Sequence, residues 1–559
     1  MTAPIASLTD ALRDAIARRF GPDVELDPAR FVQRNRGDGD RGDVQVNAAF
    51  ALAKQLRRNP AEIAAELAEA IEAEPFAPGE VSGKAFVNFR LRDEWLLAEI
   101  ERRAAAERLL EPATRPEHVL IDFSSPNVAK EMHVGHLRTT IIGDSLARMF
   151  EARGHRVDRV SHVGDWGTQF GMLIRLIQED ALDVSTLSVA ELDRLYKQAK
   201  ARFDADPSFQ EGARRAVVAL QSGEAEARRV WEQLRDRSND EFQAIYERLD
   251  VRVVEVGESF YQPMLAGVVS ELERLGLITV DDGAKCVFLE GHSIPLIVQK
   301  ADGGFNYAAT DLAAVRHRVG EGADRMLYVV DHGQSQHFDM VFSVARKAGW
   351  LPEDVVCEHI PFGLVLGEDG KRLRTRSGDS IPLRSLIEEA EERGRLLARE
   401  HDAPEETGTH LGVSGLKYAE LSHNRMTNYV FSFDKMVSLE GNTAPYMLYA
   451  YARINGIVER ARSARAGEPR TQLGDAERGL AKLLADFEDV VDRAIAEYQP
   501  SDVTEYLFAL SQEFNRFYET SRVVSGDEVD VLRLRLCEVT AATLRAGLGL
   551  LGVRTLERI

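Results

Sequence analysis

The spacing of hydrophobic and polar positions differs between the parts of the chain. In the first part, apolar residues recur at helical spacing over residues 50–56 and in NPAEIAAELAEAI (residues 59–71), and a strand-like segment, KAFVNFRL, follows at residues 84–91. Helical segments mixed with short strands indicate a small α+β domain. We predict this separate N-terminal domain over residues 1–112.

Short apolar runs alternate with helical segments between residues 113 and 383. The runs occupy residues 119–123, 157–163, 286–289, 326–330 and 362–366. This alternation predicts a mostly parallel sheet that is covered by helices. A charge-rich helical stretch at about residues 179–250 interrupts the alternation, and we interpret it as a helical insertion.

From about Ser385 onward the pattern is almost wholly helical. It includes the long segments PYMLYAYARINGIVERARSARA and RLRLCEVTAATLRAGLGLLGV. We predict a helical junction over residues 384–440 and an all-α helical bundle over residues 441–559.

Composition narrows the class of protein. The chain has 559 residues, is 44% hydrophobic, and shows neither a signal-peptide pattern nor a long uncharged apolar run, so we expect a soluble multi-domain protein with no membrane role. Its three cysteines, Cys286, Cys357 and Cys537, are far apart, which fits buried apolar residues in a reducing compartment. A formal net charge of -21 argues against nonspecific nucleic-acid binding but leaves a local basic surface open.

Two histidines stand where a strand runs into a helix, in SSPNVAKEMHVGHLRTT (residues 124–140). Ligands of α/β sheets bind beyond the carboxyl ends of strands, where helix N-termini favour anions. His133 and His136 can donate hydrogen bonds to a phosphate there, and Gly135 has no side chain to block the ligand. The alternatives are half of a zinc site, for which no third ligand is evident, and a structural or chance tetrapeptide; we predict no metal site.

The surrounding blocks carry a family resemblance. HVGH matches the HIGH signature of class I aminoacyl-tRNA synthetases, and SSPNVAKEMHVGHLRTTIIGD, SHVGDWGTQFGMLI and GNTAPYMLYAYARI resemble arginyl-tRNA synthetases. GDVQVNAAFALAK and GKAFVNFRL resemble the additional, tRNA-contacting N-terminal domain of that family, and the C-terminal helices resemble its anticodon-binding bundle. The resemblance implies a Rossmann-type class I catalytic core that activates arginine with ATP and transfers it to the 2′-hydroxyl of the terminal adenosine of tRNA, with activation dependent on tRNA.

The resemblance also implies an ATP site made of two segments. His133, Gly135 and His136 belong to the first, and KRLRTRSG (residues 371–378) stands where the family has KMSKS, after a turn at Asp369 and Gly370. The residues expected to bind ATP there are Lys371, Arg374, Arg376 and Ser377. Arg376 occupies the place of the second lysine, and Lys130 is expected to supply a compensating cation near the same phosphates. Mg²⁺ is expected to accompany ATP without a protein site of its own.

Recognition of arginine requires carboxylates, because a guanidinium group presents donors and no acceptor. Glu258 in GESFY, and Tyr307 with Asp311 in YAATD, match family positions, and the last two share one face if they lie on a helix. By the same resemblance Ser125, Asn127 and Gln334 hold the amino-acid head group and Asp122 supports that end of the pocket. Gln336 competes with Gln334 for its role.

The bundle is expected to contact RNA through Arg453, Arg460 and Arg462, whereas Phe514 and Phe517 are expected to be core residues for the most part.

The predicted protein is a cytoplasmic monomer with tRNA(Arg), L-arginine and ATP as partners. The rivals are a class I synthetase for glutamate, glutamine or cysteine and a noncatalytic tRNA-binding paralogue. The Asp311 carboxylate of YAATD and the absence of cysteine ligands for zinc count against cysteine, and the histidines with the basic loop count against the paralogue.

Overall fold

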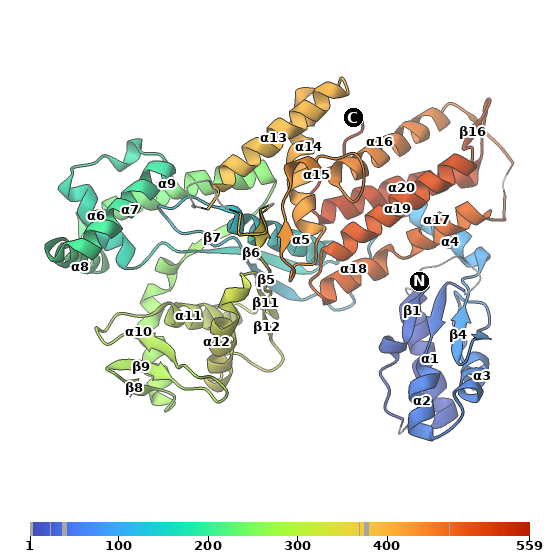
Figure 1. The fold of residues 1–559 in the computed structure, drawn as a ribbon. Helices are drawn as coiled ribbons and strands as arrows, with labels where there is room; N and C mark the ends of the chain where they lie inside the picture. Colours follow the sequence, from blue (N-terminus) through green and yellow to red (C-terminus); the bar gives the residue numbers. More distant parts are fainter. Residues whose placement is uncertain are drawn as a thin grey trace.

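An antiparallel four-stranded sheet with helices against it forms the N-terminal part of the computed structural model (Figure 1), which describes residues 4–22, 24–35, 42–367, 369–373, 380–468 and 470–558. Its elements are α1 (Pro4–Phe20), β1 (Val32–Arg34), β2 (Val44–Val46), α2 (Ala48–Leu56), α3 (Pro60–Ala70), β3 (Glu80–Ser82) and β4 (Phe86–Phe89), followed by α4 (Asp93–Ala105). The α+β prediction is confirmed, and α1 is an additional helix. Asn59 explains the start of α3, because its side chain accepts a hydrogen bond from the Ala61 N–H (3.0 Å).

A five-stranded sheet forms the centre of the molecule, with strand order β12-β11-β5-β6-β7, and every neighbouring pair is parallel. The strands are β5 (His118–Asp122), β6 (Arg156–Val163), β7 (Val254–Gly257), β11 (Arg325–Tyr328) and β12 (Val356–His359). The predicted parallel sheet is therefore confirmed. The chain leaves β5 toward β6 on one side and later returns to β11 on the other, so ligands are expected beyond the carboxyl ends of β5 and β11.

Two predicted strands do not belong to this sheet. The run at residues 286–289 contributes to β9 (Ala284–Val287), which pairs antiparallel with β8 (Thr279–Asp281) and β10 (Leu296–Gln299). Asp282 and Gly283 have φ of 45° and 79°, the left-handed pair that closes a tight hairpin and excludes a parallel crossover. The run at residues 362–366 supplies the short β13 (Val365–Leu366), which pairs with β14 (Tyr429–Val430) in a separate two-stranded sheet.

The charge-rich stretch folds into helices, as predicted, and forms the lobe at the left of Figure 1. Its helices are α7 (Val189–Ala205), α8 (Pro207–Gln221) and α9 (Ala225–Leu249), and the preceding helix α6 (Thr168–Glu179) packs against α7 and α8 in the same lobe. Met172, Leu176, Phe209 and their neighbours make a small core inside the lobe. Helix α10 (Glu258–Arg274) and helix α11 (Tyr307–Gly320) then flank the hairpin region, and α12 (Ser335–Lys347) follows β11.

The C-terminal part is a helical bundle that packs against the parallel-sheet region and the N-terminal part (Figure 1). It contains α13 (Leu383–Glu400), α14 (Glu405–Leu421), α15 (Phe433–Met436), α16 (Ala444–Ala461), α17 (Asp475–Ala485), α18 (Phe487–Ala496), α19 (Ser501–Thr520) and α20 (Val531–Leu550), with the short strands β15 (Arg465–Ala466), β16 (Val524–Ser525) and β17 (Glu528–Val529). Phe514 and Phe517 are fully buried, so both are core residues as expected.

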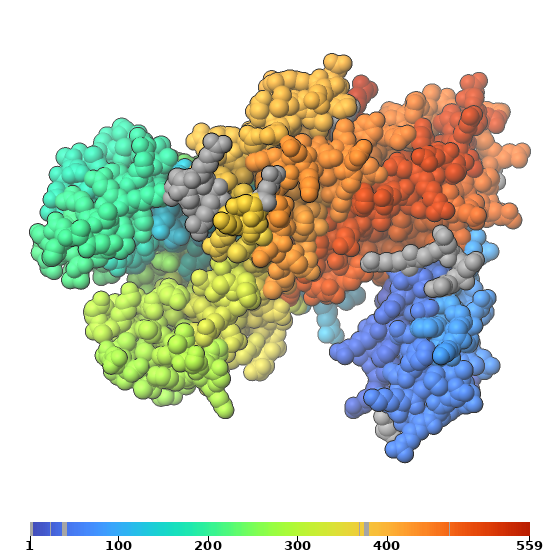
Figure 2. All heavy atoms as spheres, viewed as in Figure 1, coloured from blue at the N-terminus to red at the C-terminus, as the bar shows by residue number. Residues whose placement is uncertain are grey.

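Ion pairs hold the N-terminal domain on the bundle. Asp43 pairs with Arg478 and Lys482 of α17, at 2.9 Å for Nη2 and 2.9 Å for Nζ, and Arg34 pairs with Asp489 of α18 at 2.7 Å. Figure 2 shows this domain in blue against the bundle, with a wide hollow between it and the region of α10 to α12. Within the described part of the chain, none of the helices is long and apolar enough to cross a bilayer.

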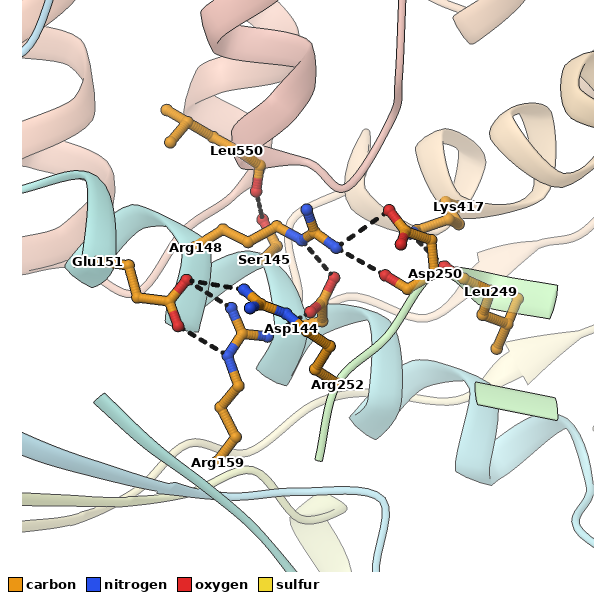
Figure 3. Close-up of polar contacts among 10 residues, drawn as sticks. All are labelled: Asp144, Ser145, Arg148, Glu151, Arg159, Leu249, Asp250, Arg252, Lys417 and Leu550. Atoms are coloured by element: carbon orange, nitrogen blue, oxygen red, sulfur yellow. Dashed lines mark hydrogen bonds and ion pairs between the residues drawn. The ribbon is translucent and has the colours of Figure 1, made fainter. Parts of the chain in front are cut away.

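Buried charges fix the helix α5 (Val134–Ala152), which follows β5 (Figure 3). The Asp144 carboxylate accepts hydrogen bonds from Arg148 Nε (2.7 Å) and from Arg159 Nη1 of β6 (2.5 Å). One residue further, Ser145 Oγ donates to the Leu550 carbonyl at the end of α20 (3.0 Å). The middle of α5 is therefore tied both to the sheet and to the last helix of the bundle.

Candidate active site

The two histidines build the N-terminus of α5. His133 is the N-cap: its Nδ1 accepts a hydrogen bond from the Gly135 N–H (3.1 Å), and the His133 N–H donates to His136 Nδ1 (3.0 Å). Since Nδ1 is the acceptor in both rings, the proton of each neutral ring lies on Nε2. A Cβ on Gly135 would lie 2.9 Å from His133 Cε1. Gly135 is thus required by the folded-back ring of His133, a reason that differs from the ligand approach expected from the sequence.

Both rings are neutral near pH 7. Burial, followed by the charges of Arg372 and Lys130, lowers the pKa of His133. Burial, followed by the neighbouring His133, lowers the pKa of His136 to about 3. Each histidine therefore offers one Nε2–H donor and no positive charge at the helix N-terminus.

The loop between β5 and α5 is strained. Ser124, Ser125 and Ala129 have positive φ of 71°, 46° and 60°, which costs a non-glycine residue roughly 1 kcal/mol or more and persists only when the surroundings enforce it. The Ser124 N–H donates to Thr139 Oγ1 of α5 (2.9 Å), and the Ala129 N–H donates to Ser238 Oγ of α9 (2.9 Å). The helical insertion therefore helps to shape the loop that precedes the histidines.

A cavity of about 360 Å³ lies at the end of β5 and β11, where the strand order predicts a ligand. Ser125, His133, Gly135 and His136 line it, so the structure brings these sequence-predicted residues together. The lining also includes residues that sequence reasoning missed: Ser124, Val134, Arg138, Thr139, Val329, Val330, Asp331, Phe362, Gly363, Leu364, Val365, Arg372, Leu373 and Ser380. These residues come from six separate stretches of the chain (124, 134–139, 329–331, 362–365, 372–373 and 380), so the sequence carries no local signal for their convergence.

The basic segment is only partly described. Lys371 is exposed, its N–H donates to Asp369 Oδ1 (3.0 Å), and Gly370 has φ of 71° in the expected turn. Arg372 lines the cavity and acts electrostatically on His133. Arg374, Arg376 and Ser377 lie outside the described residues. Lys130 Nζ lies 4.3 Å from the centre of the Tyr196 ring on α7, and its charge also reaches His133.

Carboxylates gather at the start of α10 and on α11. Burial, then the charges of Asp311 and Asp165, raise the pKa of Glu258, the first residue of α10, to about 8. Asp165 was not predicted from the sequence; it is buried and accepts hydrogen bonds from the Ser259 N–H (2.8 Å) and from Ser259 Oγ (2.6 Å). These acids repel one another, so a cation is favoured between them.

Tyr307 and Asp311 lie on α11, as their spacing predicts. Asp311 Oδ2 lies 2.6 Å from His337 Nε2, and the Tyr307 and His337 rings contact each other at a tilt of 50°, with centroids 4.6 Å apart. Tyr307 is 56% exposed, so its ring borders open space. His337, in DHGQSQH, is a further residue of this group that the sequence did not single out.

The residues expected to hold an amino-acid head group have different surroundings. Asp122 is buried and accepts hydrogen bonds from Arg318 Nη2 (2.7 Å) and Ser125 Oγ (3.0 Å), so it orients Ser125. Asn127 is exposed, and its side chain passes over Gly164, where a Cβ would clash with it. Gln334 and Gln336 are both exposed.

The arginines expected to contact RNA are exposed. Arg453 and Arg460 lie on α16 and Arg462 follows its end. The Arg453 guanidinium lies 4.9 Å from the centre of the Tyr518 ring, and Arg462 pairs with Glu459 (2.6 Å).

A parallel sheet of this order, with HVGH at the N-terminus of the helix that follows its central strand, defines a class I aminoacyl-tRNA synthetase. Family models match along the chain: the catalytic domain of class I tRNA synthetases (R) at residues 100–433, the arginyl tRNA synthetase N terminal domain at residues 6–91, and the DALR anticodon binding domain at residues 447–559. The chain therefore belongs to the arginyl-tRNA synthetase family, whose members are ligases that form aminoacyl-tRNA.

Relatives and solved structures agree with this assignment. Arginine–tRNA ligases of Synechococcus sp. and Synechococcus elongatus are 49% and 48% identical to the chain, with 100% of each chain covered. The arginyl-tRNA synthetase of Plasmodium falciparum has a TM-score of 0.85 at 29% identity and full coverage of both chains. That of Thermus thermophilus has a TM-score of 0.83 at 26% identity, covering 99% of this chain and 100% of its own.

Proposed function

We propose that the chain joins arginine to tRNA(Arg) in two steps at the cavity where α5 begins. In the first, an arginine carboxylate oxygen attacks the α-phosphate of ATP, so that a new P–O bond forms and pyrophosphate leaves. In the second, the 2′-hydroxyl of the terminal adenosine of tRNA attacks the activated carbonyl, an ester forms and AMP leaves. The pair of neutral histidines with Nε2–H donors at the cavity is the observation that carries this proposal.

His133 and His136 act on the charge that develops at the α-phosphate. Donors fixed before the reaction stabilise such charge without reorganising. Gly135 keeps the His133 ring in place, and the free N–H groups of the first turn of α5 favour the same anion.

Cations complete the ATP site in this proposal. The family resemblance assigns the cations Lys130, Lys371, Arg374 and Arg376, together with the neutral hydroxyl of Ser377, to the phosphates. Arg372 joins them because it lines the cavity. Mg²⁺ would enter with ATP and screen the phosphate charge. Among the residues described, no group of three or more His, Cys, Asp or Glu side chains is arranged to hold a metal, so none of them is assigned to it.

Glu258, Tyr307 and Asp311 are proposed to bind the guanidinium group of arginine. The repulsion among Glu258, Asp311 and Asp165 supports this, because a bound guanidinium relieves it. Ser125, Asn127 and Gln334 are assigned to the amino-acid head group, with Asp122 holding Ser125 in position.

Ionisation of Glu258 should couple arginine binding to pH. Its pKa is raised to about 8, so at lower pH the carboxyl is protonated and must lose its proton when the guanidinium binds. The KM for arginine should therefore rise by about fivefold as the pH falls from about 8 to about 7. The guanidinium group of arginine stays charged throughout this pH range, so the change in KM reports ionisation of the enzyme and not of the guanidinium.

The assay is pyrophosphate exchange with tRNA present, at several arginine concentrations for each pH. Glu258→Gln should abolish this pH dependence and leave a KM for arginine that is higher and constant across the pH range. A flat profile for the wild-type enzyme would show that Glu258 does not titrate in the arginine pocket.

The bundle is proposed to hold tRNA(Arg), with Arg453, Arg460 and Arg462 against its phosphates, and to make arginine activation depend on bound tRNA. The match to an anticodon binding domain and the exposure of these side chains support the assignment. Pyrophosphate exchange measured with and without tRNA tests the dependence of activation on tRNA. Exchange should require tRNA, and equal rates with and without it would refute the dependence.

Cytoplasmic location and a monomeric state remain predictions.

Replacing the three arginines together by alanine should raise the KM for tRNA by at least about tenfold. The salt dependence of this KM should also become shallower, because binding releases fewer counterions from the RNA when fewer arginines contact its phosphates. KM values for ATP and arginine should stay as in the wild type. Charging assays over a series of salt concentrations provide the measurement, and an unchanged salt slope would remove these residues from the RNA surface.

A further inference from the structure

Arg138 is a buried cation on the wall of the cavity. It lies on α5 two residues after His136, is 1% exposed and is among the residues that line the cavity. Its Nη1 donates to the Gly363 carbonyl (2.9 Å) and to the Thr427 carbonyl (3.3 Å). Arg138 thus connects the histidine helix to the segment around Gly363, which also lines the cavity.

The partner of Arg138 comes from α14. Glu420 is also 1% exposed, and its Oε1 lies 2.5 Å from Arg138 Nε. Its Oε2 accepts a hydrogen bond from the Tyr429 hydroxyl (2.6 Å), and the guanidinium group lies 5.2 Å from the centre of the Tyr429 ring. A buried ion pair of this kind is costly to break, because either partner alone leaves an uncompensated charge.

The segment that Arg138 contacts forms one wall of the cavity, from Phe362 to Val365. It is held by residues that follow α14: the Gly363 N–H donates to the Arg425 carbonyl (2.8 Å) and the Leu364 N–H donates to Asn428 Oδ1 (2.7 Å). Strand β13 then pairs with β14, whose first residue is Tyr429. Helix α14 in turn packs against α16 and α19 of the bundle.

We propose that Arg138 and Glu420 form a positioning pair that sets the wall formed by residues 362–365 at the correct distance from His136, and that ATP affinity thereby depends on the seating of α14 and the bundle. The inference rests on the proposed function, in which this cavity holds ATP. Neither side chain takes part in bond making; both act through the wall and through α5.

Two substitutions test the pair. Arg138→Lys keeps the charge but cannot reach Gly363, Thr427 and Glu420 together, and Glu420→Gln keeps an acceptor for Tyr429 but removes the charge. In pyrophosphate exchange with tRNA present, both variants should raise the KM for ATP at least about tenfold and change the KM for arginine by less than about twofold. Tyr429→Phe, which deletes one hydroxyl, should give a smaller rise of the same kind and carries the test if a charged variant does not fold.

A matched control lies on the same two helices. Lys417 is buried on α14, its Nζ donates to the Leu249 carbonyl (2.5 Å), and it faces Asp144 of α5 (Figure 3). Lys417→Met should lower the thermal unfolding midpoint and leave the KM for ATP within about twofold of wild type, because this contact does not reach the cavity wall.

The outcomes separate the possibilities. An ATP KM within about twofold of wild type in a folded Arg138→Lys or Tyr429→Phe enzyme would overturn the proposal, and so would an equal rise for ATP and arginine. A rise in the ATP KM of Lys417→Met as large as that of Arg138→Lys would show a general loss of packing instead. Failure of the wild-type enzyme to charge tRNA with arginine would refute the proposed function itself.

Discussion

Replacing His133 or His136 by alanine is expected to slow arginyl-adenylate formation by about 10²- to 10³-fold, the usual effect of removing one fixed donor from developing negative charge. The physical reason is the loss of an Nε2–H donor at the α-phosphate, since each Nδ1 is already occupied by a backbone N–H. Binding of tRNA should be nearly unchanged. Pyrophosphate exchange with tRNA present measures the rate, and filter binding measures the tRNA affinity.

Alanine also removes the cap of α5, so a matched pair of variants is needed. His133→Asn and His136→Asn retain an oxygen that can take the place of Nδ1 and accept the backbone hydrogen bond, but they lack the distal donor. They should restore the thermal stability that the alanine variants lose and still be slow in pyrophosphate exchange. Wild-type exchange rates in the asparagine variants would remove the Nε2–H donors from the mechanism and leave a purely structural cap.

Asp311→Asn is expected to raise the KM for arginine by about 30- to 1000-fold and to leave the KM for ATP within about twofold, because a neutral amide cannot supply the charge-assisted acceptor that a guanidinium needs. No editing domain is needed to exclude lysine, since lysine would leave buried acceptors unpaired. Both KM values are measured in the same exchange assay.

Asp339→Asn provides the matched control. Asp339 also pairs with a histidine, His292, at 3.1 Å, but its side chain is 68% exposed and it is not among the assigned pocket residues. The control should leave both KM values as in the wild type. If Asp311→Asn raised the KM values for arginine and ATP together, Asp311 would be a structural residue and the pocket would be placed elsewhere.

The central strands and the histidine helix could be predicted because their signals are local. An apolar run followed by HVGH and helical spacing predicts a strand that leads into a helix N-terminus, which is the arrangement of β5 and α5. The runs at residues 286–289 and 362–366 also predict strands, and the structure has strands there. The predicted place of both in the parallel sheet is wrong, because they pair with β8, β10 and β14 instead. Apolarity predicts burial, whereas the choice of partner strand depends on turns and on distant segments such as β14.

The arginine pocket could be proposed only through the family resemblance, because single acids such as Glu258 and Asp311 resemble surface residues in the sequence. The structure adds the reason why they matter, namely their mutual repulsion and the buried Asp165 beside them. Arg138 could not be found from the sequence, because its partner Glu420 lies far along the chain. The predicted domain boundaries at residues 112, 383 and 440 remain predictions.

The most direct test of the account is a charging assay of the full-length enzyme with total tRNA, ATP and one amino acid at a time. Arginine should be esterified to tRNA, whereas lysine, glutamate, glutamine and cysteine should give no product above background. Esterification of any of these four in place of arginine, or no charging with arginine, would contradict the account.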